Sequence, residues 1–152
     1  MMILLDVLVV AAVAVSMEFV AWFLHKYVMH GFLWVLHEDH HRPTHKGLQK
    51  NDLFAAFFSL VSFFLICIGL LGRLPVLASV GLGMALYGLG YFLFHDVMFH
   101  RRIPGIRIKS RHRYLRRIVR AHSIHHQHSG KSQGVSFGFL YAGKAYDQEQ
   151  AS

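Results

Sequence analysis

The sequence predicts an all-α integral membrane protein, a helical bundle with about three transmembrane helices and a histidine-rich helical cap. Whether a fourth membrane helix exists is left open. The length of 152 residues predicts a single domain, 1–152, yet 54% of the residues are hydrophobic and 14% aromatic, which is apolar for a small soluble fold. The apolar residues lie in long runs, and most basic residues and histidines lie between or after these runs.

Two of the runs predict transmembrane helices over 53–71 and 76–94. Each run has 19 residues without a charge, and only Gly72-Arg-Leu-Pro75 separates them. At about 1.5 Å of rise per residue, each reaches about 28 Å, close to the roughly 30 Å hydrocarbon core of a bilayer. Four glycines inside the second run are expected to permit close helix packing: Gly81, Gly83, Gly88 and Gly90.

The first segment, 2–24, predicts a third transmembrane helix, although it carries Asp6, Ser16 and Glu18. A secretory signal peptide would place positive charge before its apolar stretch, whereas no Lys or Arg precedes Lys26. We therefore expect this helix to be retained.

The basic residues predict the orientation of the chain. Of the 16 Lys and Arg residues, 15 lie in segments 25–52 and 95–152. Three spans place both segments on one side, and the positive-inside rule makes that side cytoplasmic. The net charge is +8, with nine basic residues in 101–120. Anionic lipid headgroups are the expected partner of this stretch, with an acidic electron-donor protein as a weaker alternative. Nucleic acid is not expected, because no nucleic-acid-binding module accompanies the charge.

Ten of the 13 histidines form a spacing pattern that occurs twice in the sequence. Neutral imidazole is the commonest metal ligand in proteins, so the repeat predicts a metal centre at the membrane surface. The first copy contains His25, His30, His37, His40 and His41, and the second contains His95, His100, His122, His125 and His126. His45, His112 and His128 fall outside the repeat, and His128 stays a candidate for a supporting position.

The spacings within each copy predict two metal ions. Residues three and four apart share one face of a helix, so His37, His40 and His41 can converge on one ion or divide between two adjacent ions. His25 and His30 are five residues apart, about 140° around an ideal helix. We therefore expect the two histidines of each pair with this spacing to approach a two-metal centre from different sides.

The type of metal stays open at this point among iron, copper and zinc, because an all-nitrogen ligand set suits each of them. Bis-histidine haem is not expected, since neither 53–71 nor 76–94 contains a histidine. No bound nucleotide is expected either, because the sequence has no dinucleotide-binding or Walker motif. Two carboxylates are candidates for orienting a ligand histidine: Glu18, an ionisable group within a predicted span, and Asp96, which follows His95.

The histidine motifs and three further segments carry a family resemblance. The segments are Gly31-Phe-Leu-Trp34, Lys50-Asn-Asp-Leu-Phe54 and Ser136-Phe-Gly-Phe-Leu140. The chain resembles the bacterial β-carotene hydroxylases, members of the fatty acid hydroxylase and sterol desaturase superfamily of histidine-rich membrane di-iron enzymes. The resemblance spans nearly the whole chain.

The resemblance implies a monooxygenase in the cytoplasmic membrane of a bacterium. It implies 3-hydroxylation of β-ionone rings, from β-carotene through β-cryptoxanthin to zeaxanthin, with two iron ions and O2. Electrons would come from a ferredoxin or a similar donor, and the carotenoid, a membrane solute, would enter between helices. Two alternatives stay open: a related di-iron hydroxylase or desaturase acting on a sterol, a fatty acyl chain or another carotenoid ring, and a non-catalytic membrane metal-binding protein.

Overall fold

The computed structural model describes residues 2–43, 47–108, 111–132 and 134–147, and every regular element in these ranges is a helix. Two of the long helices continue into wider π-helical turns. The elements in chain order are α1 (Met2–Phe23), η1 (Leu24–Phe32), α2 (Trp34–His41), α3 (Asp52–Leu71), α4 (Pro75–Tyr91), η2 (Phe92–Phe99), α5 (Arg113–Gln127) and the short 3₁₀-helix η3 (Lys144–Tyr146).

Three helices are long and apolar enough to cross a membrane. They are Met2–Phe32, Asp52–Leu71 and Pro75–Phe99, with mean hydropathies of 2.4, 2.6 and 1.7. Large side chains such as Ile3 and Leu71 point outward and are more than three-quarters exposed, which suits contact with lipid. The predicted helices over 2–24, 53–71 and 76–94 are thus confirmed, but the first and third run on to Phe32 and Phe99. Their helical hydrogen bonding continues through the first histidines of each motif instead of ending before them.

Helix α4 packs between α1 and α3 through its small residues. A Cβ atom added to Gly81 would lie 2.8 Å from the Ser62 carbonyl oxygen, and one on Gly83 would lie 2.7 Å from the Val10 carbonyl oxygen. The predicted role of glycine in close packing is therefore confirmed at these two positions. It is wrong for Gly88, whose added Cβ would meet no atom within 4 Å.

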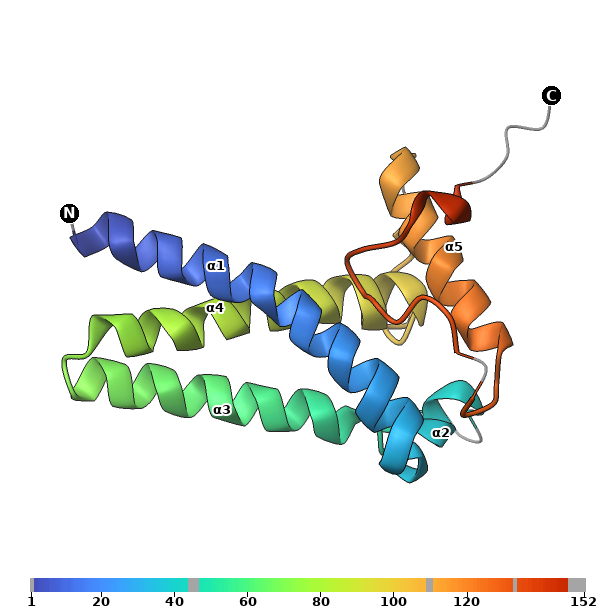
Figure 1. Ribbon diagram of the computed structural model, residues 1–152, viewed down its shortest axis with the longest axis horizontal. Coiled ribbons are helices and arrows are strands. Elements are labelled where there is room, and N and C mark those ends of the chain that lie inside the picture. The colour runs from blue at the N-terminus through green and yellow to red at the C-terminus, as the bar shows by residue number, and fades with distance from the viewer. Residues whose placement is uncertain (1, 44–46, 109–110, 133, 148–152) are drawn as a thin grey trace.

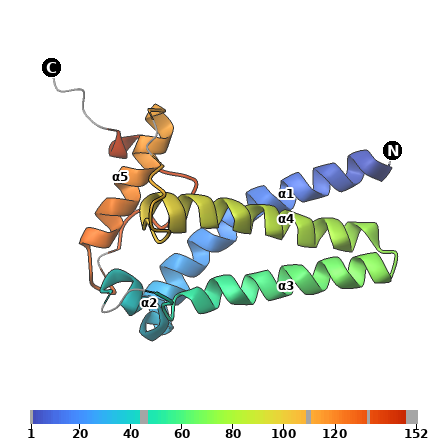
Figure 2. The same ribbon diagram turned by 180° about the vertical axis from the view of Figure 1, so that it is seen from behind.

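The bundle has two different ends (Figures 1 and 2). The N-terminus and the turn between α3 and α4 lie at one end, while α2 and α5 lie at the other. Both histidine segments therefore meet at the same end of the bundle.

Candidate metal centre

The ten repeated histidines converge at this end in two groups. In each group the ligand-type nitrogens lie within 4.8 Å of one another, so each group could hold a metal ion. The first group contains His25, His30, His37, His41 and His125, and the second contains His40, His100, His122 and His126. His95 adjoins the second group, because its Nε2 lies 3.1 Å from the Nε2 of His40.

Each half of the sequence repeat contributes one histidine to the other half's group. In α2, His37 and His41 are one helical turn apart and join the first group, whereas His40 joins the second. In α5, His122 and His126 join the second group, whereas His125 joins the first. The three repeated histidines of α2 and the three of α5 are thus each divided between the two groups.

The π-helical turns explain the five-residue spacing. In a π-helix the backbone hydrogen bond joins residues i and i+5, so side chains five apart lie nearly above one another. η1 contains both His25 and His30, whose ring centroids are 5.2 Å apart, and η2 brings His95 and His100 to 4.5 Å. The expectation that these pairs approach from different sides was wrong, since it assumed α-helical geometry.

Oxygen acceptors fix the orientation of six of the rings. The acceptors are backbone carbonyls, side-chain amide oxygens and one carboxylate, so Nδ1 of each ring carries the proton and donates. The Nδ1 distances are 2.9 Å for His25 to Phe137 O, 3.1 Å for His30 to Lys131 O, 2.6 Å for His37 to Asn51 Oδ1, 2.9 Å for His40 to Gln49 Oε1, 2.9 Å for His95 to Asp96 Oδ1 and 2.6 Å for His125 to Val135 O.

With the proton on Nδ1, the Nε2 lone pairs of these rings point toward one another. Nε2 of His25 lies 3.1 Å from Nε2 of His37, and Nε2 of His30 lies 3.3 Å from Nε2 of His125. Nε2 of His40 likewise lies 3.1 Å from Nε2 of His95. Facing lone pairs repel unless a cation lies between them. Two nitrogens bound to one ion at about 2.1 Å, with perpendicular bonds, would lie about 3.0 Å apart. The donor set and its spacing therefore fit a first-row metal ion.

The second group has the same character. Nε2 of His100 and Nε2 of His122 are 2.8 Å apart. The buried Nε2 of His126 has no hydrogen-bond partner within the described ranges of the chain, a situation that a bound cation would relieve.

Burial keeps these imidazoles neutral, as metal binding requires. Burial and the neighbouring histidines lower the pKa of His37 and of His41 to about 2. Burial likewise lowers the pKa of His100 to about 3 and that of His125 to about 4. At neutral pH the lone pairs are therefore available to a metal.

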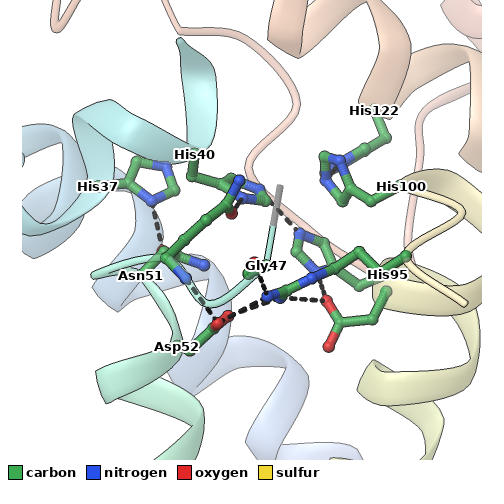
Figure 3. Close-up of polar contacts among 11 residues, drawn as sticks. His37, His40, Gly47, Asn51, Asp52, His95, His100 and His122 are labelled. Atoms are coloured by element: carbon green, nitrogen blue, oxygen red, sulfur yellow. Dashed lines mark hydrogen bonds and ion pairs between the residues drawn. The ribbon is translucent and has the colours of Figure 1, made fainter. Parts of the chain in front are cut away.

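The start of α3 supports the centre through residues that sequence reasoning did not single out (Figure 3). Asn51 and Gln49 accept the hydrogen bonds of His37 and His40 described above. The guanidinium of Arg102 donates to both carboxylate oxygens of Asp52 at 2.6 Å and lies 3.6 Å from Asp96, which accepts from His95. The only sequence signal was the segment Lys50-Asn-Asp-Leu-Phe54, which carried the family resemblance without a role for its polar residues.

Glu18 holds the C-terminal segment instead of a histidine. Its Oε1 accepts from the backbone N–H groups of Phe139, Leu140 and Tyr141 at 2.9–3.1 Å, and its Oε2 accepts from the Tyr87 hydroxyl at 2.8 Å. The expectation of a direct bond to a ligand histidine was wrong, because Glu18 lies more than a helical turn from η1 and faces residues 139–141. The segment that it holds supplies the carbonyl acceptors for His25 and His125.

Aromatic rings and the remaining histidines complete the surroundings. Phe137 packs edge-on against His25, His30 and His125, and Trp34 packs against His30 and His41, so the first group is shielded from water. His128 belongs to neither group. His45 lies outside the described residues.

Comparisons with known proteins show the family to which the chain belongs. The profile of the family described as "Fatty acid hydroxylase" matches residues 10–143. A protein named beta-carotene hydroxylase from Pseudescherichia vulneris is 44% identical over 95% of this chain and 81% of its own length. Proteins of the same name from Pantoea ananas and Paracoccus sp. (strain N81106 / MBIC 01143) are 44% and 41% identical, over 90% and 89% of this chain and 77% and 83% of their own lengths. No solved structure matched the chain. The chain therefore belongs to the fatty acid hydroxylase family of oxygenases, together with these bacterial relatives.

Proposed function

We propose that this chain is a carotenoid β-ring 3-hydroxylase, which converts β-carotene through β-cryptoxanthin to zeaxanthin. The observation that carries the proposal is the pair of histidine groups at one end of three apolar helices, in a chain 41–44% identical to bacterial proteins named beta-carotene hydroxylase. A polyene with two hydrocarbon rings dissolves in the bilayer, so an oxygenating centre at the end of membrane helices suits this class of substrate.

The ligand assignment follows the two groups. His25, His30, His37, His41 and His125 would hold one iron ion, and His40, His95, His100, His122 and His126 the other. Bound iron would supply the activation of O2, from which one oxygen atom enters the ring C3–H bond and the other leaves as water, with two electrons and two protons taken up. The chain's own residues present neutral Nε2 atoms, hold each ring through its Nδ1 hydrogen bond and exclude water through Phe137 and Trp34.

The electrons would come from a separate donor, a ferredoxin or a similar protein. Four arginines of 101–120 lie on α5, the helix that also carries His122, His125 and His126. The basic charge of this stretch suits both anionic lipid headgroups and an acidic donor. By the positive-inside rule, this end of the bundle would face the cytoplasm across the cytoplasmic membrane of a bacterium.

Pigment analysis in a β-carotene-producing bacterium tests the proposal. The wild-type chain is expected to yield β-cryptoxanthin and zeaxanthin, and His40→Ala to yield neither while remaining in the membrane. His112→Ala is the matched control, because His112 lies outside both groups. Unchanged β-carotene in the wild-type strain, with iron bound and a working donor, would reject the proposal in favour of a hydroxylase of another membrane lipid.

A further inference from the structure

An apolar cavity of about 560 Å³ lies among α1, α3 and α4. Its lining covers residues 17–29, 54–66 and 84–96, and so extends from α1 into η1 and from α4 into η2. The twelve residue steps along α3 correspond to about 18 Å at 1.5 Å per residue. The side chains are mostly aliphatic and aromatic, among them Phe54, Phe58 and Phe63. The cavity therefore runs lengthwise within the membrane-crossing part of the bundle.

At one end of the cavity, the lining residues contact the histidine rings. Phe139 and Tyr91 both line the cavity, and Tyr91 stacks on the ring of His95 with centroids 4.5 Å apart. The Phe139 ring is stacked on His25 and edge-on to His95, each at 5.2 Å. These two aromatic rings therefore line the cavity and also contact a histidine of each half of the repeat.

The other end closes where the helices come together. A Cβ atom on Gly81 would lie 2.8 Å from the Ser62 carbonyl oxygen and from Ile66, so α3 and α4 leave no space between them there. The cavity thus has one closed end in the bilayer and one end at the metal centre.

The side of the cavity faces lipid. α1 and α3 each pack on α4 far more than on each other. Phe63, a lining residue, is 57% exposed, which shows that the lining continues to the outer surface of the bundle. An apolar molecule in the bilayer can reach the cavity between α1 and α3 without crossing water.

We propose that this cavity binds one β-ring and the adjoining part of the polyene of a carotenoid, which enters sideways between α1 and α3. The ring meets Phe139 and Tyr91, which hold it beside the metal centre. This inference rests on the proposed function and names its substrate site. Because only one end of the cavity adjoins the centre, the two rings of β-carotene must enter in turn, and β-cryptoxanthin must leave before its second ring can enter.

Filling the cavity tests the inference. Gly88 lines the cavity and an added Cβ would meet no protein atom within 4 Å, so Gly88→Leu places a side chain in the cavity without a backbone clash. Its control is Leu86→Phe, on the same helix at a 53% exposed position outside the cavity lining. We expect Gly88→Leu to lower conversion of β-carotene more than about tenfold while iron content stays at the wild-type value, and Leu86→Phe to change neither.

The outcomes separate this inference from the proposed function. Absence of hydroxylated pigment in the wild-type strain contradicts the proposed function. Wild-type conversion by Gly88→Leu with full iron content overturns the cavity inference and leaves the proposed function standing. If Gly88→Leu loses iron, Ser59→Phe decides the question from the opposite wall, because Ser59 lines the cavity from α3. Retained iron with lost conversion supports the inference, and retained conversion overturns it.

Discussion

Replacing Glu18 should loosen the first histidine group without removing any ligand. The Glu18 carboxylate joins α1 to α4 through Tyr87 and to the C-terminal segment through three consecutive backbone N–H groups. Gly138 permits this approach, because a Cβ there would lie 2.9 Å from Glu18 Oε1. In Glu18→Ala these donors lose their acceptor, and the carbonyl oxygens of Val135 and Phe137 lose their fixed position.

The size of the effect follows from which donors are buried. Tyr87 and Phe139 are 6% and 4% exposed, whereas Tyr141 is 67% exposed and its N–H can bond to water or lipid headgroups. A hydrogen bond to a charged acceptor contributes about 1.5–3 kcal/mol, so the two buried donors suggest a loss of about 3–6 kcal/mol. Glu18→Gln keeps an amide oxygen for the backbone donors and should lose about half as much.

Thermal unfolding in detergent and elemental analysis measure these effects. For a chain of this size, the loss in Glu18→Ala corresponds to a melting temperature lower by about 6 °C or more. We also expect weaker metal binding in the first group, about 10- to 100-fold, because His25 and His125 lose their positioned acceptors. Ser16→Ala, at an exposed position on the same helix, is the control. Wild-type melting temperature and metal content in Glu18→Ala would refute the reasoning.

Three further predictions concern the supports of the centre and the helix contacts. Asn51→Leu removes the acceptor of the His37 hydrogen bond and should weaken metal binding about 10- to 100-fold, whereas Asn51→Asp keeps an acceptor and should bind metal nearly as well as the wild type. Equal metal affinities of the two variants in a metal titration would contradict this. The metal-free protein should lose stability as the pH falls below about 6.5, because histidines of the unfolded chain then bind protons whereas folded His37 and His41 stay neutral down to pH of about 2. For each of these two histidines the free energy of unfolding should fall by about 1.4 kcal/mol per pH unit, and a melting temperature that is constant between pH 7.5 and 5 would argue against it. Gly83→Ala should cost about 1–3 kcal/mol by overpacking against Val10 and Val13, with Gly88→Ala as the uncrowded control in the same melting experiment.

The membrane bundle could be predicted from the sequence because its cause is local. Runs of apolar residues long enough to span a bilayer are visible in the composition of each segment, and helix is the backbone structure that satisfies hydrogen bonds within such a segment. The ends of the helices were less accessible. Helices α1 and α4 continue into η1 and η2 because the π-helical turns keep the backbone bonded through His25 and His95. Nothing in residue composition distinguishes that continuation from a helix that stops.

The supports of the centre could not be predicted because they depend on contacts between distant segments. Asn51 follows His37 by 14 residues, and Glu18 precedes Phe139 by 121 residues. Histidine draws attention by its chemistry, whereas an amide such as Asn51, or the carbonyl oxygen of Val135, becomes important only through its position. The carboxylate of Glu18 was visible as an unusual residue in a membrane helix, but its partners are backbone groups that sequence does not mark.

Each half of the repeat contributes one histidine to the other half's group, so the two groups are more closely connected than the spacing of the histidines alone implies. Helix α2 sends His40 to the group of the second half, and α5 sends His125 to the group of the first. Neither half supplies all the histidines of its own group, because each group takes one histidine from the other half of the repeat. An ion in either group would therefore join α2 to α5, and its binding energy would stabilise the contact that also shapes the other group. We therefore expect the repeated histidine motif to form one two-part centre, and to form it only when both halves of the chain are folded together.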